Sequence, residues 1–164
     1  MKKNLQRLGF FLLFSLLIAA SFVVKNPAAL PVTERTIKRH GYELCYDFRT
    51  RQPRWVYEHL TEKNLQRNAS REGVEFKKDS LVPQIFQAQN SDYKGSGFDR
   101  GHLCPAGDTK DNLEAMTETF FLSNISPQTP DFNRGYWLKL ERHVRELLKQ
   151  HRELHVYSGC LYFL

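Results

Sequence analysis

Residues that could do chemistry are concentrated between Gly95 and Asp108, in the run GSGFDRGHLCPAGD. Asp99, Arg100 and His102 fall within four residues of one another, and nearby glycines let the backbone approach a ligand closely. A neutral imidazole can act as a general base because its ordinary pKa, about 6.5, lies close to neutral pH. This segment therefore predicts a site where a proton can be accepted beside a cation.

A second group of polar residues follows further along the chain. Glu141 and Arg145 stand four residues apart, so a helix would place them on one face. Asn133 precedes Glu141 by eight residues, a little over two helical turns, and can border the same side. Amide and carboxylate oxygens suit a hard cation, and guanidinium groups suit phosphate. With His102, these residues supply the parts of a metal-assisted phosphodiesterase.

The elements that would position these residues indicate an α+β domain. Alternation of apolar and polar residues over 42–48 predicts a strand, and Trp55-Val56-Tyr57 begins its antiparallel partner after a turn. Apolar residues at helical spacing from Trp137 to Leu148 predict the one long helix, with Asn133 just ahead of it or in its first turn. Shorter elements are expected as a helix over 111–116 and strands over 119–122 and 153–157.

Composition favours a single domain with an export signal. The chain has 164 residues, of which 41% are hydrophobic, and its mean hydropathy of -0.53 excludes a polytopic membrane protein. Lys2, Lys3 and Arg7 precede an apolar run from Leu8 to Val24, which is typical of an export signal. Residues 1–24 are therefore expected to be a signal peptide or a retained signal anchor, followed by a linker over 25–40.

These alternatives give two expected locations. A cleaved signal predicts a periplasmic or extracellular protein, and a retained anchor predicts a membrane-anchored domain outside the cytoplasm. An oxidising compartment would permit one disulfide among Cys45, Cys104 and Cys160, but sequence alone does not choose the pair, and three unpaired thiols are an equal alternative. The formal net charge of +6 includes three charges of the N-terminal segment, so bulk charge is a weak argument for nucleic-acid binding.

Several motifs resemble those of the DNA/RNA non-specific endonucleases, which are ββα-metal (His-Me finger) nucleases. The matching runs are FDRGHL, LSNISPQ and FNRGYWLKLE, and REGVEF with SDYKGSGFDRGH is similar to the endonuclease G branch. The resemblance covers the chain from Gly41 onward and implies a nuclease domain over 41–164, with an antiparallel sheet and one long catalytic helix. Family members continue beyond the VYSG strand, so the resemblance also implies a scaffold that is incomplete at the C-terminus.

The resemblance implies a role for each matching residue of the metal site. His102 resembles the general base that deprotonates the attacking water. Asn133 resembles the single direct protein ligand of Mg²⁺, for which Mn²⁺ is expected to substitute, and Glu141 resembles the carboxylate that holds metal-bound waters. Asn124 matches a catalytic-site asparagine, and Asp99 is expected to orient either the loop or His102.

Three arginines resemble the phosphate-binding set. They are Arg100, Arg145 and an upstream residue assigned to Arg71, although Arg67 is close enough to confuse the assignment. DNA and RNA are the implied substrates, because contacts to phosphate and metal carry no base information. A membrane is an expected partner only if the N-terminal segment is retained, and a homodimer is an option because relatives often form dimers.

Structural readings compete with each of these roles. Asn133 is also suited to cap a helix, Glu141 and Arg145 to form a solvated surface pair, and Arg100 to pair with Asp99. The sequence thus favours a magnesium-dependent, sugar-non-specific endonuclease. The alternatives are a catalytically inactive remnant that binds nucleic acid weakly and a membrane-tethered binding protein.

Overall fold

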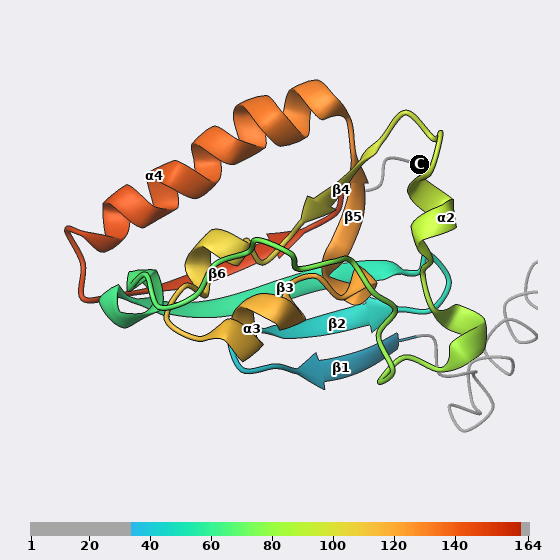
Figure 1. Ribbon diagram of the computed structural model, residues 1–164, viewed down its shortest axis with the longest axis horizontal. Helices are drawn as coiled ribbons and strands as arrows, with labels where there is room; N and C mark the ends of the chain where they lie inside the picture. The colour runs from blue at the N-terminus through green and yellow to red at the C-terminus, as the bar shows by residue number, and fades with distance from the viewer. Residues whose placement is uncertain (1–33, 162–164) are drawn as a thin grey trace, which may run out of the picture. The chain divides into compact units, whose positions relative to one another are not determined.

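A four-stranded antiparallel sheet supports the molecule, as the computed structural model shows for residues 34–161 (Figure 1). The strand order is β1-β2-β3-β6, so β1 and β6 are the two edges. The predicted strand pair is confirmed, because β2 and β3 pair antiparallel across a turn over 48–51. The strands are β1 (Glu34–Lys38), β2 (Glu43–Asp47), β3 (Gln52–Thr61) and β6 (Glu153–Gly159).

The first strand changes the expected boundary of the domain. β1 lies inside the segment 25–40 that the sequence suggested was a linker, and it pairs with β2 from Glu34↔Asp47 to Lys38↔Glu43. Its sequence, ERTIK, carries a single buried apolar residue, Ile37, so it has no strand pattern of its own. Pairing with the edge of β2 makes it a strand. The predicted signal segment, 1–24, lies outside the described residues.

A small two-stranded sheet carries the central motif. Strand β4 (Asp99–His102) pairs antiparallel with β5 (Ile125–Gln128), so that His102 faces Ile125 across the ladder. Helix α2 (Asn90–Tyr93) precedes this pair, and α3 (Leu113–Glu118) lies between its two strands in the sequence. The short helix expected over 111–116 thus corresponds to α3.

The strand expected over 119–122 is wrong. The backbone N–H and the hydroxyl of Thr119 both donate to the carbonyl of Met116, which closes the end of α3 as a turn. Only Phe121 forms an isolated bridge, with Lys77, and a short 3-10 helix follows over Leu122–Asn124. Hydrogen bonds to the preceding helix therefore override the apolar pattern of this segment.

The long helix begins with a wide turn. A π-helical segment covers Phe132–Trp137 and continues directly into α4 (Leu138–Leu148), which confirms the predicted helix and places Asn133 in its first turn. π-helical turns of this kind are often found at functional sites. The unit β4, β5 and α4 is the ββα arrangement that the resemblance implies.

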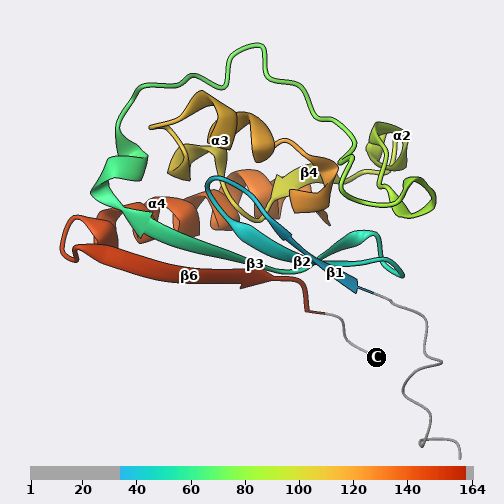
Figure 2. The ribbon, with the colours of Figure 1, turned by 90° about the horizontal axis from the view of Figure 1, so that it is seen from below.

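The helices lie on one side of the four-stranded sheet. Figure 2 shows α3, α4 and β4 on the same side, and on β3 the side chains of Val56, Glu58 and Leu60 are buried. Alternation along the strand puts the neighbouring side chains on the opposite face. Glu58 is therefore a carboxyl group on the core side of the sheet, where an apolar residue would be usual.

The described part of the chain contains neither a disulfide bond nor a membrane-spanning helix. Cys45, Cys104 and Cys160 are all free thiols there, which agrees with the alternative of three unpaired cysteines. Between residues 34 and 161, the structure contains no helix that is long and apolar enough to cross a membrane.

Candidate active site

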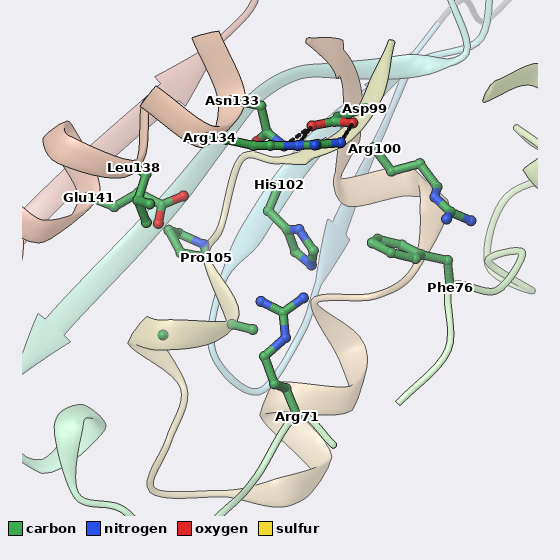
Figure 3. Close-up of a pocket in the computed structure, with 12 residues that line it drawn as sticks. Arg71, Phe76, Asp99, Arg100, His102, Pro105, Asn133, Arg134, Leu138 and Glu141 are labelled. Carbon is green, nitrogen blue, oxygen red and sulfur yellow. Dashed lines mark hydrogen bonds and ion pairs between the residues drawn. The ribbon is translucent and has the colours of Figure 1, made fainter. Parts of the chain in front are cut away.

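A cleft of about 400 Å³ opens between β4, the start of the long helix and the loop around Arg71 (Figure 3). The structure brings six of the eight predicted site residues to its walls and leaves out Asn124 and Arg145. The six are Arg71, Asp99, Arg100, His102, Asn133 and Glu141.

The β4–β5 ladder explains the order of residues in DRGH. Arg100 and His102 are two residues apart on a strand, so they lie on the same face. Gly101 faces the other way, where a Cβ atom would lie 2.3 Å from the Cδ of Gln128. A larger residue at Gly101 would therefore require the buried side chain of Gln128 to move.

His102 sits in an aromatic and cationic environment. Its ring centroid lies 5.2 Å from that of Phe76 and 4.9 Å from that of Phe120, which it meets edge-on. Its backbone carbonyl accepts a hydrogen bond of 3.0 Å from the indole Nε1 of Trp137. Burial, and then the positive charge of Arg71, lower the pKa of His102 to about 3. The imidazole is therefore neutral at physiological pH.

The Nε2 atom of His102 is buried and has no hydrogen-bond partner within residues 34–161. Buried polar atoms are nearly always satisfied, so an orphan of this kind calls for an explanation. His102 itself lines the cleft, and its neutral imidazole can accept a proton from a molecule bound there.

Asp99 holds Asn133 in place. Its Oδ2 accepts hydrogen bonds from Asn133 Nδ2 (2.9 Å) and Arg134 Nε (2.8 Å), and its Oδ1 accepts from Arg134 Nη2 (2.7 Å), as Figure 3 shows. These bonds, with that to Arg134 the strongest influence, hold the pKa of Asp99 below its ordinary value. Because the amide nitrogen of Asn133 is committed to Asp99, its oxygen is left to accept from, or coordinate, a ligand. Asp99 therefore orients Asn133, a third role besides the two expected for it, and its ion pair is with Arg134 and not with Arg100.

Arg71 and Arg100 are two of the three arginines that line the cleft, the third being Arg134. The guanidinium group of Arg71 points toward His102 in Figure 3 and lies 5.3 Å from the centroid of the Phe120 ring. Arg100 lies 4.4 Å over the Phe76 ring and donates a 2.8 Å hydrogen bond to Asn90 Oδ1. Arg67 does not line the cleft, so the structure favours Arg71 as the upstream arginine.

Arg145 has a different position from the one expected. Its Nη1 donates a 2.7 Å hydrogen bond to Asp108 Oδ1, and its Nη2 lies 3.7 Å from Glu141 Oε2. The buried carboxyl of Asp108 holds this guanidinium, and Arg145 does not line the cleft, so its assignment to phosphate stays a prediction. The solvated-pair alternative also fails, because the side chains of Arg145 and Glu141 are each only 17% exposed. Burial raises the pKa of Glu141, against the opposing charge of Arg145.

Asn124 is a buried connector outside the cleft. Its Oδ1 accepts from the backbone N–H of Cys104, and its Nδ2 donates to the carbonyls of Cys104 and Thr119, each at 2.9 Å. Its position in LSNISPQ suggested a catalytic role, which stays a prediction, because Asn124 does not line the cleft. Asn124 ties the loop after β4 to the end of α3, because its amide both accepts and donates hydrogen bonds.

Three residues of the site were missed from the sequence. Arg134 adjoins Asn133 in FNRGYW, and this adjacency was an available signal for its pairing with a nearby carboxylate. Phe76, in REGVEF, contacts both His102 and Arg100, but nothing in its local pattern predicts this. Glu58 lies beneath the site, where its Oε2 accepts a 3.2 Å hydrogen bond from Cys104 Sγ.

The fold and the cleft together define a class of protein. A histidine on the first strand of a ββα unit and an asparagine at the start of its helix, both lining one cleft, agree with the ββα-metal nucleases. The sequence profile of the DNA/RNA non-specific endonucleases matches residues 20–164. The chain belongs to this family, as its motifs suggested.

Individual relatives indicate that the chain belongs to the endonuclease G-like branch of this family. It is 46% identical over 121 residues to the human mitochondrial nuclease EXOG and 40% identical over 133 residues to human mitochondrial endonuclease G. These matches cover 74% and 81% of this chain but 33% and 45% of the relatives. A solved structure titled as the EndoG/EndoGI complex superposes with a TM-score of 0.77 at 40% identity, covering 82% of this chain and 56% of that one. The chain thus spans less than half the length of these curated relatives.

The comparisons correct the expected location. EXOG of mouse and human, nuclease 1 of Schizosaccharomyces pombe and human endonuclease G are all mitochondrial by name. An exported or secreted protein with a signal peptide was therefore the wrong interpretation of the basic and apolar N-terminus. A basic, apolar leader is a weak signal by itself, because targeting segments of several kinds contain both features. The expectations of a homodimer and of membrane contact receive no support from these relatives.

Proposed function

We propose that this chain is a metal-dependent, sugar-non-specific endonuclease that hydrolyses phosphodiester bonds in DNA and RNA. His102 carries the proposal, because its imidazole is neutral and the residue lines a cleft that also holds Arg71 and Arg100. Membership of the nuclease family supports the same reading.

The residues of the cleft fit a Mg²⁺ ion. Asn133 offers an amide oxygen that the hydrogen bond to Asp99 leaves available, and Glu141 offers a carboxylate on the same wall. Mg²⁺ prefers oxygen ligands and keeps several waters, so a site with few protein ligands suits it. Asn133 would hold the ion directly, and Glu141 would hold its waters. When bound, the ion would stabilise negative charge that develops on the phosphate and on the leaving oxygen.

The side chains of the cleft account for the remaining steps. Arg71 and Arg100 would bind the non-bridging phosphate oxygens and orient the phosphorus toward His102. A water between His102 and the phosphorus would lose its proton to the neutral imidazole as it attacks. The negative phosphate would also offset the charge of Arg71, one of the two causes of the lowered pKa of His102, and so make the base stronger when substrate is bound.

The same geometry supports a lack of selectivity between DNA and RNA. The polar groups of the cleft are suited to phosphate and metal, and such contacts position a nucleic acid without reading its bases. Activation of an external water needs no 2′-hydroxyl. Both DNA and RNA are therefore expected to be substrates.

Replacing His102 tests the proposal. Supercoiled plasmid and a structured RNA are incubated with the chain in Mg²⁺ and in EDTA, and with His102→Ala. Wild type should cleave both substrates only with metal. His102→Ala should lower the rate by about 10²–10⁴-fold, since that is what general-base catalysis contributes.

His143→Ala serves as the control, because His143 is an exposed histidine on α4 outside the cleft. It should cleave at the wild-type rate. A well-folded wild type that leaves both substrates intact would favour the inactive remnant. Equal cleavage by His102→Ala and wild type would contradict the assignment of the base.

A further inference from the structure

The face of the sheet turned away from α3 and α4 carries a second cluster of metal-ligating side chains. His59 of β3 lies directly opposite His155 of β6 in the antiparallel register, and Glu153 is two residues from His155 on the same face. All three residues are exposed. None of them lines the catalytic cleft, which lies on the helix side of the sheet.

The three side chains already converge. One ring nitrogen from each histidine and one carboxylate oxygen of Glu153 all lie within 4.8 Å of one another. His59 Nε2 and Glu153 Oε2 are 2.7 Å apart, and the two imidazole rings stack at a centroid distance of 4.8 Å with an interplanar angle of 5°. Zinc–nitrogen and zinc–oxygen bonds are about 2.0–2.2 Å long, so small rotations of exposed side chains suffice to bring the three ligands onto one ion.

A neighbouring tyrosine completes the arrangement. The hydroxyl of Tyr57 lies 2.8 Å from His155 Nδ1. Metal-bound histidines usually donate their second ring N–H to an oxygen, which fixes the tautomer and the ring orientation. If His155 donates from Nδ1 to Tyr57, its Nε2 is left with the lone pair that a metal ion needs.

We propose that His59, Glu153 and His155 form a surface site for one Zn²⁺ ion, with water in the fourth position. Two imidazoles and a carboxylate suit zinc, whereas Mg²⁺ prefers an all-oxygen octahedron, so the site is chemically distinct from the catalytic one. The ion would join β3 to β6. Because β6 is an edge strand that pairs with β3 alone, zinc would hold this strand on the sheet.

Isothermal titration with ZnCl₂ tests the site, using the untagged chain in excess Mg²⁺ to keep the catalytic cleft occupied. Wild type should bind one Zn²⁺ per chain, and EDTA should reverse the binding. His59→Gln/His155→Gln should lose this binding, and His151→Gln, which changes an exposed histidine outside the cluster, should keep it. Absence of zinc binding by wild type, or equal binding by the double variant, would overturn the proposal.

Chemical protection provides a second test that needs no variant. Diethyl pyrocarbonate modifies accessible histidines, and mass spectrometry of the peptides locates the modification. Zinc should protect His59 and His155 and leave His151 reactive, and it should slow amide hydrogen exchange in β6. Unchanged reactivity of His59 and His155 at saturating zinc would contradict the site. Both readouts are independent of nuclease activity.

Discussion

Single hydrogen bonds decide what each side chain of the cleft can do. The amide of Asn133 could present either its oxygen or its nitrogen to the cleft. The carboxylate of Asp99 can only accept a hydrogen bond, so it selects the orientation in which the amide nitrogen faces Asp99. The oxygen is thereby directed away from Asp99 and left for a cation. Arg134 in turn fixes Asp99 through two further bonds. Asp99 is therefore a positioning residue that acts through Asn133.

Replacing Asp99 with asparagine should lower the affinity of the site for Mg²⁺ while the protein remains folded. Asp99→Asn loses the ion pair with Arg134 and allows the Asn133 amide to turn over. The Mg²⁺ concentration needed for half-maximal cleavage should rise by about 10–100-fold, as is usual when a residue that orients a metal ligand is replaced. Titration of the cleavage rate with Mg²⁺ measures this change.

Arg134→Gln is the matched comparison, because it removes the same ion pair and leaves the bond from Asn133 to Asp99. It should shift the Mg²⁺ requirement less than Asp99→Asn does. Equal shifts for the two variants would show that the ion pair, and not the orientation of Asn133, supports the metal.

At the scale of elements, buried connections hold β4 and the long helix in place. The indole N–H of Trp137, in the π-helical turn, donates to the carbonyl of His102 and so connects the long helix to β4. Asn124 ties the segment just after β4 to the end of α3 with three hydrogen bonds. The cleft therefore depends on side chains that never reach it.

Asn124→Ala tests this connecting role. The change leaves the N–H and the carbonyl of Cys104 and the carbonyl of Thr119 without their side-chain partner, at about 1–3 kcal/mol for each group left buried and unpaired. The free energy of unfolding should fall by about 3 kcal/mol. Urea unfolding followed by circular dichroism measures it. Rate per folded molecule should stay within a few-fold of wild type, and a stable but inactive variant would instead support a catalytic role for Asn124.

For the molecule as a whole, the notable feature is a group of carboxyl groups in the cleft wall and beneath it, formed by Glu58, Asp108 and Glu141. Burial, and then the charge of Asp108, raise the pKa of Glu58 well above its ordinary value, while the bond from Cys104 opposes this rise. Burial likewise raises the pKa of Asp108 and Glu141, with Arg145 opposing. A carboxyl group with a raised folded-state pKa stabilises the fold below its ordinary pKa, and this stability is lost as pH rises toward the folded value.

Glu58→Gln should therefore stabilise the protein increasingly at higher pH. Glutamine keeps the size and polarity of the side chain but has no proton to lose. The melting temperature of Glu58→Gln minus that of wild type should grow as pH rises from 5 toward 8. Differential scanning calorimetry across this range checks it.

The difference in melting temperature between Glu58→Gln and wild type cancels the contribution of His102, which is present in both proteins. The effect of His102 on stability changes with pH in the opposite direction to that of Glu58. The pKa of His102 is lowered in the folded state to about 3, so its contribution to stability is lost as pH falls below about 6.5. A difference between variant and wild type that stays constant with pH would show that Glu58 keeps its ordinary pKa.

The sequence by itself determined the class of the fold, the family and most of the cleft. Local signals sufficed for these: the alternation that forms β2 and β3, the helical stripe of α4, and the motifs around His102 and Asn133. Tertiary structure decided which polar residues are available for chemistry. Arg145 and Asn124 carry suitable groups, but Asp108 and the backbone around Cys104 occupy them. β1 is a strand only because β2 offers an edge, and Arg134 holds Asp99 only because the long helix lies against β4. Hydrogen-bond partners far apart in sequence are set by packing, and no local pattern encodes them.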